Sequence, residues 1–201
     1  GIGFASARKS AEDGCRALMI SDIHPRRLEE AVAKLKAETG LESIWGQVCN
    51  VTNEEDVQAL VAAAEEKLGG VDVLINNAGL GGEKRVTEMT DEEWSRVLDI
   101  TLTGTFRMTR AMLPHMEKRG RGAIVNNASV LGLRAQKGQA HYAAAKAGVM
   151  ALTSCSALEA AENGVRINAV SPSIALHDFL KKASSAELLE QLASREAFGR
   201  A

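Results

Sequence analysis

Short aliphatic runs alternate with amphipathic helical stretches along the chain, and no other feature restricts the fold as much. The apolar runs are predicted strands, and they lie at 15–21, 43–48, 71–75, 123–127 and 165–170. Between them, apolar residues recur three and four positions apart, as Leu28, Val32 and Leu35 do, which is typical of a buried helix face. The run after Gly70 has almost no polar alternation, as expected of a strand covered on both faces. This alternation predicts an α/β fold with a doubly wound parallel sheet in a three-layer α/β/α arrangement.

Capping signals and glycines set the expected helix boundaries. Thr52 with Glu55, and Thr90 with Glu93, have the spacing of a capping box, in which hydroxyl and carboxylate each satisfy a free backbone N–H. The expected helices cover 4–13, 26–38, the stretch from Thr52 to Gly69, 90–120 with a bend at Pro114, and 141–163. Because no linker-like stretch interrupts the pattern, the 201 residues are predicted to form a single domain.

Composition excludes several classes of function. A formal net charge of −2 lacks the basic footprint of a nucleic-acid binder, and no apolar run reaches the ~18 residues of a membrane span. Cys15, Cys49 and Cys155 are too few and too far apart for a disulfide framework or a paired zinc site, which predicts a cytoplasmic protein without a metal. The chain begins at Gly1 without Met or a signal peptide, as the interior of a longer protein would.

Glycines and an acidic residue mark the first strand–helix junctions. In doubly wound sheets, ligands bind beyond the carboxyl ends of the strands. Gly1, Ile2 and Gly3 lead into a helix, where glycines let a pyrophosphate approach the helix N-terminus, although an ordinary turn has the same pattern. Asp22 ends the next strand about 20 residues on, where a carboxylate accepts from ribose hydroxyls; an Asx turn is the alternative. A carboxylate there repels a 2′-phosphate and favours NAD over NADP, a preference that the arginines at 26 and 27 would soften.

A third junction reads Asn76-Asn77-Ala78-Gly79 and follows the run at 71–75. Adjacent side-chain amides bond to neighbouring loops, while Ala and Gly leave room for a flat ligand against the backbone. A polar turn stabilised by asparagine is the alternative. Since this tetrapeptide is expected by chance in under ~1% of chains of this length, we interpret it as part of a nucleotide site.

Tyr142, the only tyrosine, precedes Lys146 by four positions in an expected helix. This spacing puts both side chains on one helix face, with Cβ atoms ~5–6 Å apart. A tyrosine with an ordinary pKa of ~10 becomes an acid or base near pH 7 only if a neighbouring cation favours the phenolate, and Lys146 supplies that cation. A solvated pair on the helix surface is the alternative.

Ser129 ends the strand that begins at Ala123, thirteen positions before Tyr142, and is expected at the same sheet edge. A hydroxyl there holds a substrate carbonyl oxygen while Tyr142 passes it a proton. A serine that caps the next turn is the alternative. Serine, tyrosine and lysine beside nucleotide loops describe a hydride-transfer site that needs no metal.

These motifs together resemble the short-chain dehydrogenase/reductase family, of the single-domain type, over the whole chain. Gly1-Ile2-Gly3 is similar to the tail of the family's Thr-Gly-x-x-x-Gly-x-Gly loop. The other matching pieces are Asn76–Gly79, Ser129, Tyr142-x-x-x-Lys146 and Val165–Pro172. The resemblance implies a Rossmann-type fold, a nicotinamide cofactor, and hydride transfer to or from a secondary alcohol or ketone (EC 1.1.1.-).

The resemblance also implies roles for the catalytic residues. Tyr142 would be the general acid/base, Lys146 would lower its pKa and bind the nicotinamide ribose, and Ser129 would orient the carbonyl. The further residues implied in cofactor binding are Gly1, Ile2, Gly3, Asp22, Asn50, Val51, Asn77, Ala78, Gly79 and Pro172.

The chain departs from the family pattern in three respects. Thr101 stands where the family places an Asn that holds a water linked to Lys146, so we expect a threonine hydroxyl to hold that water less rigidly. Ser173 replaces the usual Gly after Pro172, and Asn50 replaces an Asp at the adenine. The family's first strand precedes Gly1 and its last helix and strand follow the final residue, so a chain truncated at both ends is expected.

The segment from about 174 to 198 is expected beside the substrate. Its apolar residues have the pattern of a lid or, equally, of a core-packing helix: Leu176, Phe179, Leu180, Leu188, Leu189 and Leu192. Arg134, Lys137 and His141 would meet an anionic group such as a carboxylate or CoA phosphate, or form a solvated basic loop.

Within the family, the stretches 129–150 and 172–199 are similar to bacterial 3-oxoacyl thioester reductases and to reductases of steroid-ring breakdown. Relatives form tetramers through the helices that begin near Asp91 and His141, which implies a homo-oligomer. The expected partner is otherwise a small-molecule substrate. A nucleotide-binding relative without turnover is the alternative, motivated by Thr101 and the missing ends; the intact Ser129, Tyr142 and Lys146 favour the enzyme.

Overall fold

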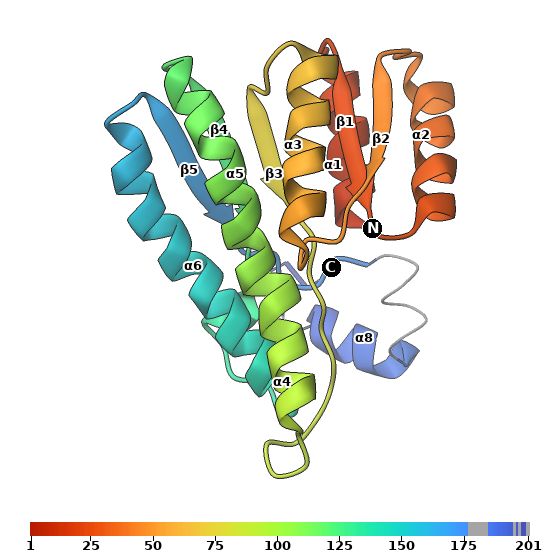
Figure 1. Cartoon of the computed structure of the whole chain (residues 1–201). Coiled ribbons are helices and arrows are strands. Elements are labelled where there is room, and N and C mark those ends of the chain that lie inside the picture. The colour runs from red at the N-terminus through yellow and green to blue at the C-terminus, as the bar shows by residue number, and fades with distance from the viewer. Residues whose placement is uncertain (177–184, 195, 197, 200–201) are drawn as a thin grey trace.

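Parallel strands and helices alternate throughout the computed structural model, which describes residues 1–176, 185–194, 196 and 198–199 (Figure 1). The strands are β1 (Leu18–Asp22), β2 (Ile44–Val48), β3 (Val73–Asn76), β4 (Gly122–Asn127) and β5 (Val165–Val170). The α-helices are α1 (Ile2–Glu12), α2 (Pro25–Thr39), α3 (Glu54–Leu68), α4 (Asp91–Leu98), α5 (Gly104–Lys118), α6 (Ala140–Ala161) and α8 (Ala186–Ser194). A π-helical turn (Asp99–Thr103) joins α4 to α5, and a 3₁₀ turn (Val130–Gly132) follows β4.

The strands form two parallel ladders, β1–β2 and β3–β4–β5. In the second ladder Ile75 lies opposite Val125, and Val125 opposite Asn168. Among the described residues no ladder joins β1 to β3, so β3 is an edge strand of its sheet. Val73 is 56% exposed and Ile75 is 40% exposed. The expectation that this strand is covered on both faces is therefore wrong for these two side chains.

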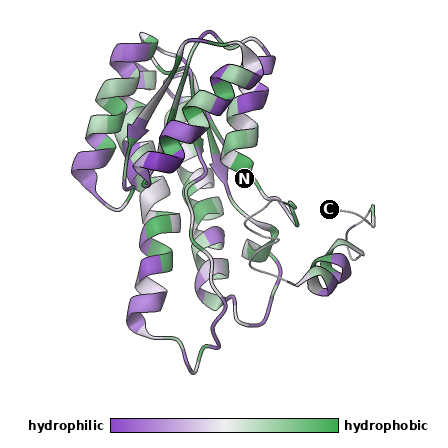
Figure 2. Cartoon of the chain, turned by 90° about the vertical axis from the view of Figure 1, so that its right-hand side faces the viewer, coloured by the Kyte–Doolittle hydropathy of each residue, from purple (hydrophilic) through white to green (hydrophobic). Residues whose placement is uncertain are grey.

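Helices lie on both sides of the strands. Helix α5 contacts both α3 and α6, and these three helices cover one side, while α1 packs with α2 against β1 and β2 (Figure 1). The main core lies under the first group, with Val57, Met116 and Ile124 fully buried. A smaller core surrounds Leu35 and Ile44. Figure 2 shows the layers from the side, with hydrophilic and hydrophobic residues alternating along each helix.

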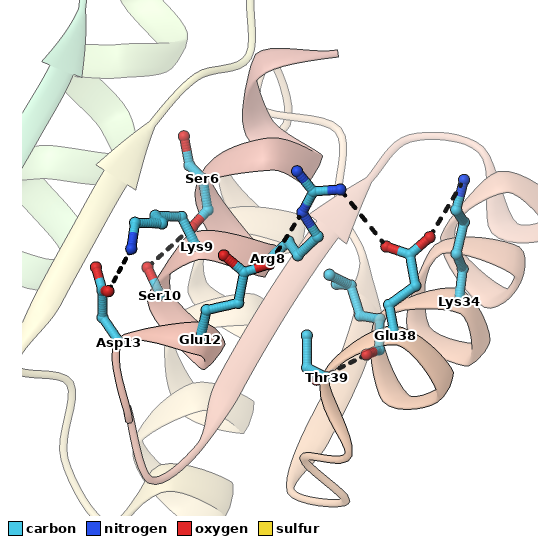
Figure 3. Close-up of polar contacts among 10 residues, drawn as sticks. Ser6, Arg8, Lys9, Ser10, Glu12, Asp13, Lys34, Glu38 and Thr39 are labelled. Atoms are coloured by element: carbon cyan, nitrogen blue, oxygen red, sulfur yellow. Dashed lines mark hydrogen bonds and ion pairs between the residues drawn. The ribbon is translucent and has the colours of Figure 1, made fainter.

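The outer faces of α1 and α2 are linked by charged side chains (Figure 3). The Arg8 guanidinium lies 3.4 Å from the Glu12 carboxylate within α1 and 3.9 Å from the Glu38 carboxylate on α2. Lys34 lies 3.7 Å from Glu38. Since these side chains are about a third to two thirds exposed, each pair contributes at most about 1 kcal/mol. These ion pairs orient α1 relative to α2 and add little to the free energy of unfolding.

Helix boundaries follow the predicted signals with two corrections. Thr90 and Glu93 form the predicted capping box, in which the Glu93 backbone N–H donates to the Thr90 hydroxyl at 3.1 Å. The box predicted at Thr52 is wrong, because Asn53 caps α3 and accepts from the Asp56 N–H at 2.9 Å. The predicted long helix is interrupted at 99–103, where the π-helical turn inserts an extra residue into the helical repeat.

No helix in the part of the chain that the structure describes is long and apolar enough to cross a membrane.

Candidate active site

The candidate site lies where the parallel strands end. Asp22 closes β1, Asn76 closes β3, Ser129 follows β4 and Pro172 follows β5. Parallel strands place their carboxyl ends at the same edge of a sheet, which is where α/β proteins bind ligands. The Val130 N–H donates to the Pro172 carbonyl at 3.1 Å, so the segments after β4 and β5 are tied together at this edge.

Ser129, Tyr142 and Lys146 come together as predicted. Tyr142 lies in the first turn of α6, and Lys146 lies one turn later with its Nζ 5.6 Å from the centre of the tyrosine ring. Ser129 is 8% exposed and accepts from the Leu131 N–H at 3.2 Å. Its hydroxyl also hydrogen-bonds to Tyr142, which lowers the pKa of the phenol. Ser129 therefore caps the turn after β4 and faces Tyr142 as well.

Burial controls the protonation of the pair. Burial raises the pKa of Tyr142 above its ordinary value of 10, and the hydrogen bond from Ser129 opposes this rise only in part. The ammonium of Lys146 is 3% exposed, and burial lowers its pKa to about 8. The predicted fall in the pKa of Tyr142 is thus wrong for the protein side chains alone, since desolvation outweighs the neighbouring dipole.

Lys146 is held from the strand side of the site. Its Nζ donates to the Asn127 carbonyl at the end of β4. The Asn127 side chain donates to Asn77 Oδ1 at 2.9 Å, while its own Oδ1 is buried and has no partner among the described residues. Asn127 thus joins α6 to the Asn77 loop. The sequence analysis missed this residue, because it binds Lys146 through its backbone carbonyl.

A glycine-rich loop after β3 forms one wall of the site. A Cβ at Gly79 would lie 3.6 Å from Lys146 Nζ, and one at Gly81 would lie 3.7 Å from the Tyr142 ring. At Gly82 the nearest atom would be Nε2 of His141, at 3.4 Å. The backbone from 79 to 82 therefore runs against the first turns of α6, at a distance that larger side chains would increase.

Thr101 anchors this wall. It is fully buried in the π-helical turn, and its hydroxyl accepts from the Leu80 N–H at 3.0 Å and donates to the Leu80 carbonyl at 3.2 Å. The threonine methyl would be 3.7 Å from a Cβ at Gly79. Thr101 thus lies beside Lys146, and its hydroxyl is bonded to the loop backbone.

The predicted nucleotide end starts at the N-terminus of α1. Gly1 is the N-cap and supplies no side-chain cap. A Cβ at Gly3 would lie 2.8 Å from Asn77 Nδ2, closer than real Cβ contacts allow, so glycine lets α1 approach the Asn77 loop. Ile2 lies in this first turn, and Ala78 lies between Asn77 and the Gly79 wall.

The first asparagine of the Asn-Asn-Ala-Gly motif points into the core instead. Asn76 is 7% exposed and donates to Asn126 Oδ1 at 2.9 Å and to Thr109 Oγ1 at 3.2 Å. Asn126 is fully buried and donates to Thr153 Oγ1 at 2.8 Å. This polar network joins α5, β3, β4 and α6 beneath the site.

Asp22, Asn50 and Val51 occupy the β1–β2 side of the edge. Asp22 accepts from the His24 N–H at 2.8 Å, which is the Asx turn considered as its alternative role. The Asn50 side-chain oxygen accepts from the Thr52 N–H at 3.1 Å. The amide NH₂ of Asn50 forms no hydrogen bond with any described residue. Val51 packs on α5, since a Cβ at Gly104 would lie 2.7 Å from its side chain.

The predicted lid lies only partly within the described residues. Phe179 and Leu180 lie outside them, while Leu189 on α8 is 8% exposed. A hollow of about 400 Å³ is lined by Leu176 and by residues of α8, including Leu189. Glu196, after α8, lies 2.5 Å from the Ser173 hydroxyl, which donates to it.

Comparison with known sequences gives matches along nearly the whole chain. The model of the family described as short chain dehydrogenase matches residues 1–188. The (5R,7aS)-5-hydroxy-7a-methyl-1-oxo-2,3,5,6,7,7a-hexahydro-1H-indene-carboxyl-CoA reductase of Mycobacterium tuberculosis is 59% identical over 202 residues, which cover 100% of this chain and 76% of that protein. The 3-oxoacyl-[acyl-carrier-protein] reductase FabG of Vibrio cholerae is 38% identical over 90% of this chain and 72% of that protein.

Solved structures give the same match. An actinorhodin polyketide ketoreductase with NADPH superposes with a TM-score of 0.91 and 34% identity, over 100% of this chain and 80% of that one. An NAD⁺-bound xylitol dehydrogenase superposes with a TM-score of 0.86 and 34% identity, over 96% and 72% respectively. The predicted α/β architecture is confirmed by these superpositions.

Proposed function

This chain belongs to the short-chain dehydrogenase/reductase family, and from that premise we propose which of its residues carry the reaction. The protein is an NAD(P)-dependent oxidoreductase that acts on a ketone or secondary alcohol. We propose that Tyr142 is the general acid/base and that Ser129 orients the substrate carbonyl. We propose that the Lys146 ammonium places a positive charge beside the Tyr142 phenol. The observation that carries this proposal is that Ser129 and Tyr142 contact each other beside the buried Lys146.

The residues at the nucleotide end fit a nicotinamide dinucleotide. The first turn of α1 has no side-chain cap, so its N–H groups are suited to a pyrophosphate. The buried Asn127 Oδ1 without a described partner is suited to a donor from a ligand. We assign cofactor contacts to Gly1, Ile2, Gly3, Asp22, Asn50, Val51, Asn77, Ala78, Gly79, Pro172, Tyr142 and Lys146. When bound, the nicotinamide supplies or accepts the hydride.

The protein side chains supply the proton and its path. In reduction the Tyr142 phenol donates its proton to the carbonyl oxygen, which Ser129 holds in place by a hydrogen bond. The Lys146 ammonium then lies close enough to stabilise the phenolate that remains. Thr101 keeps the Gly79–Gly82 wall against the pair, and we propose this anchoring role for it in addition to the water-holding role expected from the sequence.

We propose NAD as the preferred cofactor, with NADP as the alternative. The family neighbours include both an NADPH complex and an NAD⁺ complex, so the preference has to come from this chain's own residues. The Asp22 carboxylate at the end of β1 supports NAD, because a 2′-phosphate beside it meets a like charge.

We propose an acyl-CoA thioester as the substrate class. A CoA reductase is the relative that shares 59% identity with the whole chain, and a 3-oxoacyl carrier-protein reductase shares 38% with most of it. The hollow bounded by Leu176 and Leu189 suits the apolar acyl or ring portion, including a steroid-derived one.

We propose a homotetramer of this chain in the cytoplasm. Trp94 on α4, Phe106 on α5 and Leu158 on α6 are 38%, 40% and 77% exposed, which is more apolar surface than these helices need to expose to water. Light scattering after size-exclusion chromatography measures the mass of the assembly and so tests the tetramer. We propose that the described elements form one nucleotide-binding domain in each subunit.

Nicotinamide absorbance with a panel of ketones, 3-oxoacyl thioesters and hydroxysteroids tests the proposal. The native protein should oxidise NADH with at least one of these substrates, and Tyr142→Phe should lower kcat about 1,000-fold while leaving cofactor affinity unchanged. Equal activity in the two proteins would refute the role of Tyr142. Cofactor binding without turnover across the panel would instead support a nucleotide-binding relative.

A further inference from the structure

A second hollow, of about 430 Å³, lies at the start of α6. Ala140 and Ala143 form part of its wall, so it begins within one helical turn of Tyr142. Its other side is formed by Arg85, from the loop that continues the glycine wall, and by Lys137. The two sides are joined by the Lys84 N–H, which donates to the Gly138 carbonyl at 2.9 Å.

The two cations of this hollow are not neutralised. Arg85 and Lys137 are exposed, and the side chain of neither forms an ion pair or hydrogen bond with any residue that the structure describes. Neighbouring cations are paired: Lys84 lies 3.4 Å from Glu93, and Arg134 lies 3.6 Å from Glu196. The carboxylates of Glu93 and Glu196 are therefore engaged with cations outside the hollow.

The Glu83 side chain lies beside one lining residue of the hollow, Gly138. A Cβ at Gly138 would lie 2.7 Å from the glutamate Cγ. Glu83 forms no ion pair with Arg85 or Lys137. The lining of the hollow thus contains two cations and no carboxylate, while Glu83 and Glu88 lie in the same loop as Arg85.

The end of α6 adds to this positive potential. Gln139 is the N-cap without a side-chain cap bond, and the first turn contains no acidic residue. The free N–H groups and the helix dipole therefore present partial positive charge beside Ala140. The amides of Gln136 and Gln139, which also line the hollow, can donate to phosphate oxygens.

We propose that this hollow binds the phosphate-bearing part of coenzyme A while the acyl end lies between Ser129 and Tyr142. This inference rests on the proposed thioester substrate. It adds a site at which the protein distinguishes CoA from thiols that lack the phosphates. The hollow has the size of a small-molecule site, and two unpaired cations suit a nucleotide phosphate better than the extended acidic surface of a carrier protein. Arg85 and Lys137 are specificity residues, and they do not touch the reacting atoms.

Calorimetric titration of the full chain with CoA and with pantetheine tests this assignment, because pantetheine lacks every phosphate. The test variant is Arg85→Gln with Lys137→Gln. The matched control is Arg16→Gln with Lys118→Gln, which removes two equally exposed and unpaired cations from the opposite edge of the sheet. We expect the native chain to bind CoA more tightly than pantetheine. The test variant should raise the Kd for CoA about tenfold and leave pantetheine unchanged.

Three results would overturn the assignment: equal Kd values for CoA in the native and test proteins, an equal rise in the control variant, or native protein that does not distinguish CoA from pantetheine. A fall in turnover of acetoacetyl-carrier protein with unchanged CoA affinity would assign the hollow to a carrier protein instead. Reduction of a simple cyclic ketone by each variant is measured in parallel. If that activity persists while CoA fails to bind, the substrate class is wrong and the Tyr142 mechanism stands.

Discussion

Replacement of Thr101 by valine removes one buried hydroxyl from the wall of the site and keeps the shape of the side chain. In the native protein this hydroxyl bonds to both backbone groups of Leu80, at 3.0 and 3.2 Å, in a position without solvent access. Thr101→Val leaves the Leu80 N–H without that acceptor, which costs about 2 kcal/mol in the free energy of unfolding. For a chain of this size the Tm should fall by about 4–8 °C.

Activity should fall as well, because the loop that Thr101 anchors lies against Lys146 and Tyr142. A shift of the Gly79–Gly82 backbone changes the position of the reacting groups, and we expect kcat/KM to fall about tenfold. Thr101→Ser is the matched control, since it keeps the hydroxyl and removes only a methyl group worth about 1 kcal/mol.

Differential scanning fluorimetry and nicotinamide absorbance measure both effects. The serine variant should retain most of the native kcat/KM, and the valine variant should not. If valine and serine variants have the same Tm and the same kcat/KM, the Thr101 hydroxyl does not hold the loop. A valine variant with native stability but strongly reduced kcat would instead point to the water-holding role.

The buried network, the α1 contact and the two titrating groups give further predictions. Asn126→Leu should lower the free energy of unfolding in urea by about 2 kcal/mol, because it removes bonds of 2.8 and 2.9 Å from a fully buried position. Gly3→Ala should raise the Kd for NADH about tenfold in fluorescence titration, since the new Cβ forces Asn77 away; an unchanged Kd would contradict the contact. The free energy of unfolding of the native protein, measured relative to that of Lys146→Met, should increase between pH 8 and pH 10.5. Burial lowers the pKa of Lys146 to about 8 in the folded protein, so the unfolded chain binds more protons in that window. Ketone reduction should be fastest near neutral pH and alcohol oxidation should gain rate above it, as stopped-flow absorbance can measure, because the pKa of Tyr142 is raised.

The positions of the proposed catalytic residues were predictable because they depend on local rules. Four residues along a helix bring Tyr142 and Lys146 to one face whatever surrounds them, and parallel strands bring Ser129 to the same edge as the glycine loop. The residues that were missed depend on tertiary contacts. Asn127 acts through its backbone carbonyl, which binds Lys146, and no side-chain pattern reveals that bond.

The errors have different physical origins. Thr52 and Asn53 are adjacent, both can cap a helix, and the chain uses Asn53 because Thr52 bonds to Asn50 instead. The apolar run at β3 was expected to be covered on both faces, but hydropathy alone does not say whether a neighbouring strand pairs with it. The π-helical turn at 99–103 covers only five residues, too few for apolar periodicity to reveal it.

Burial in this site favours the neutral forms of both Tyr142 and Lys146, and this has a consequence for the direction of the reaction. A phenol with a raised pKa keeps its proton near neutral pH, which is the form that donates to a ketone oxygen. Oxidation of an alcohol requires the phenolate, whose population grows as the pH rises. The Lys146 ammonium, which stabilises that phenolate, is itself lost as the pH passes about 8. The gain in oxidation rate should therefore level off above that pH. The protein's own side chains thus favour reduction near neutral pH, with the Ser129 hydrogen bond and the Lys146 charge opposing the cost of burying the phenolate.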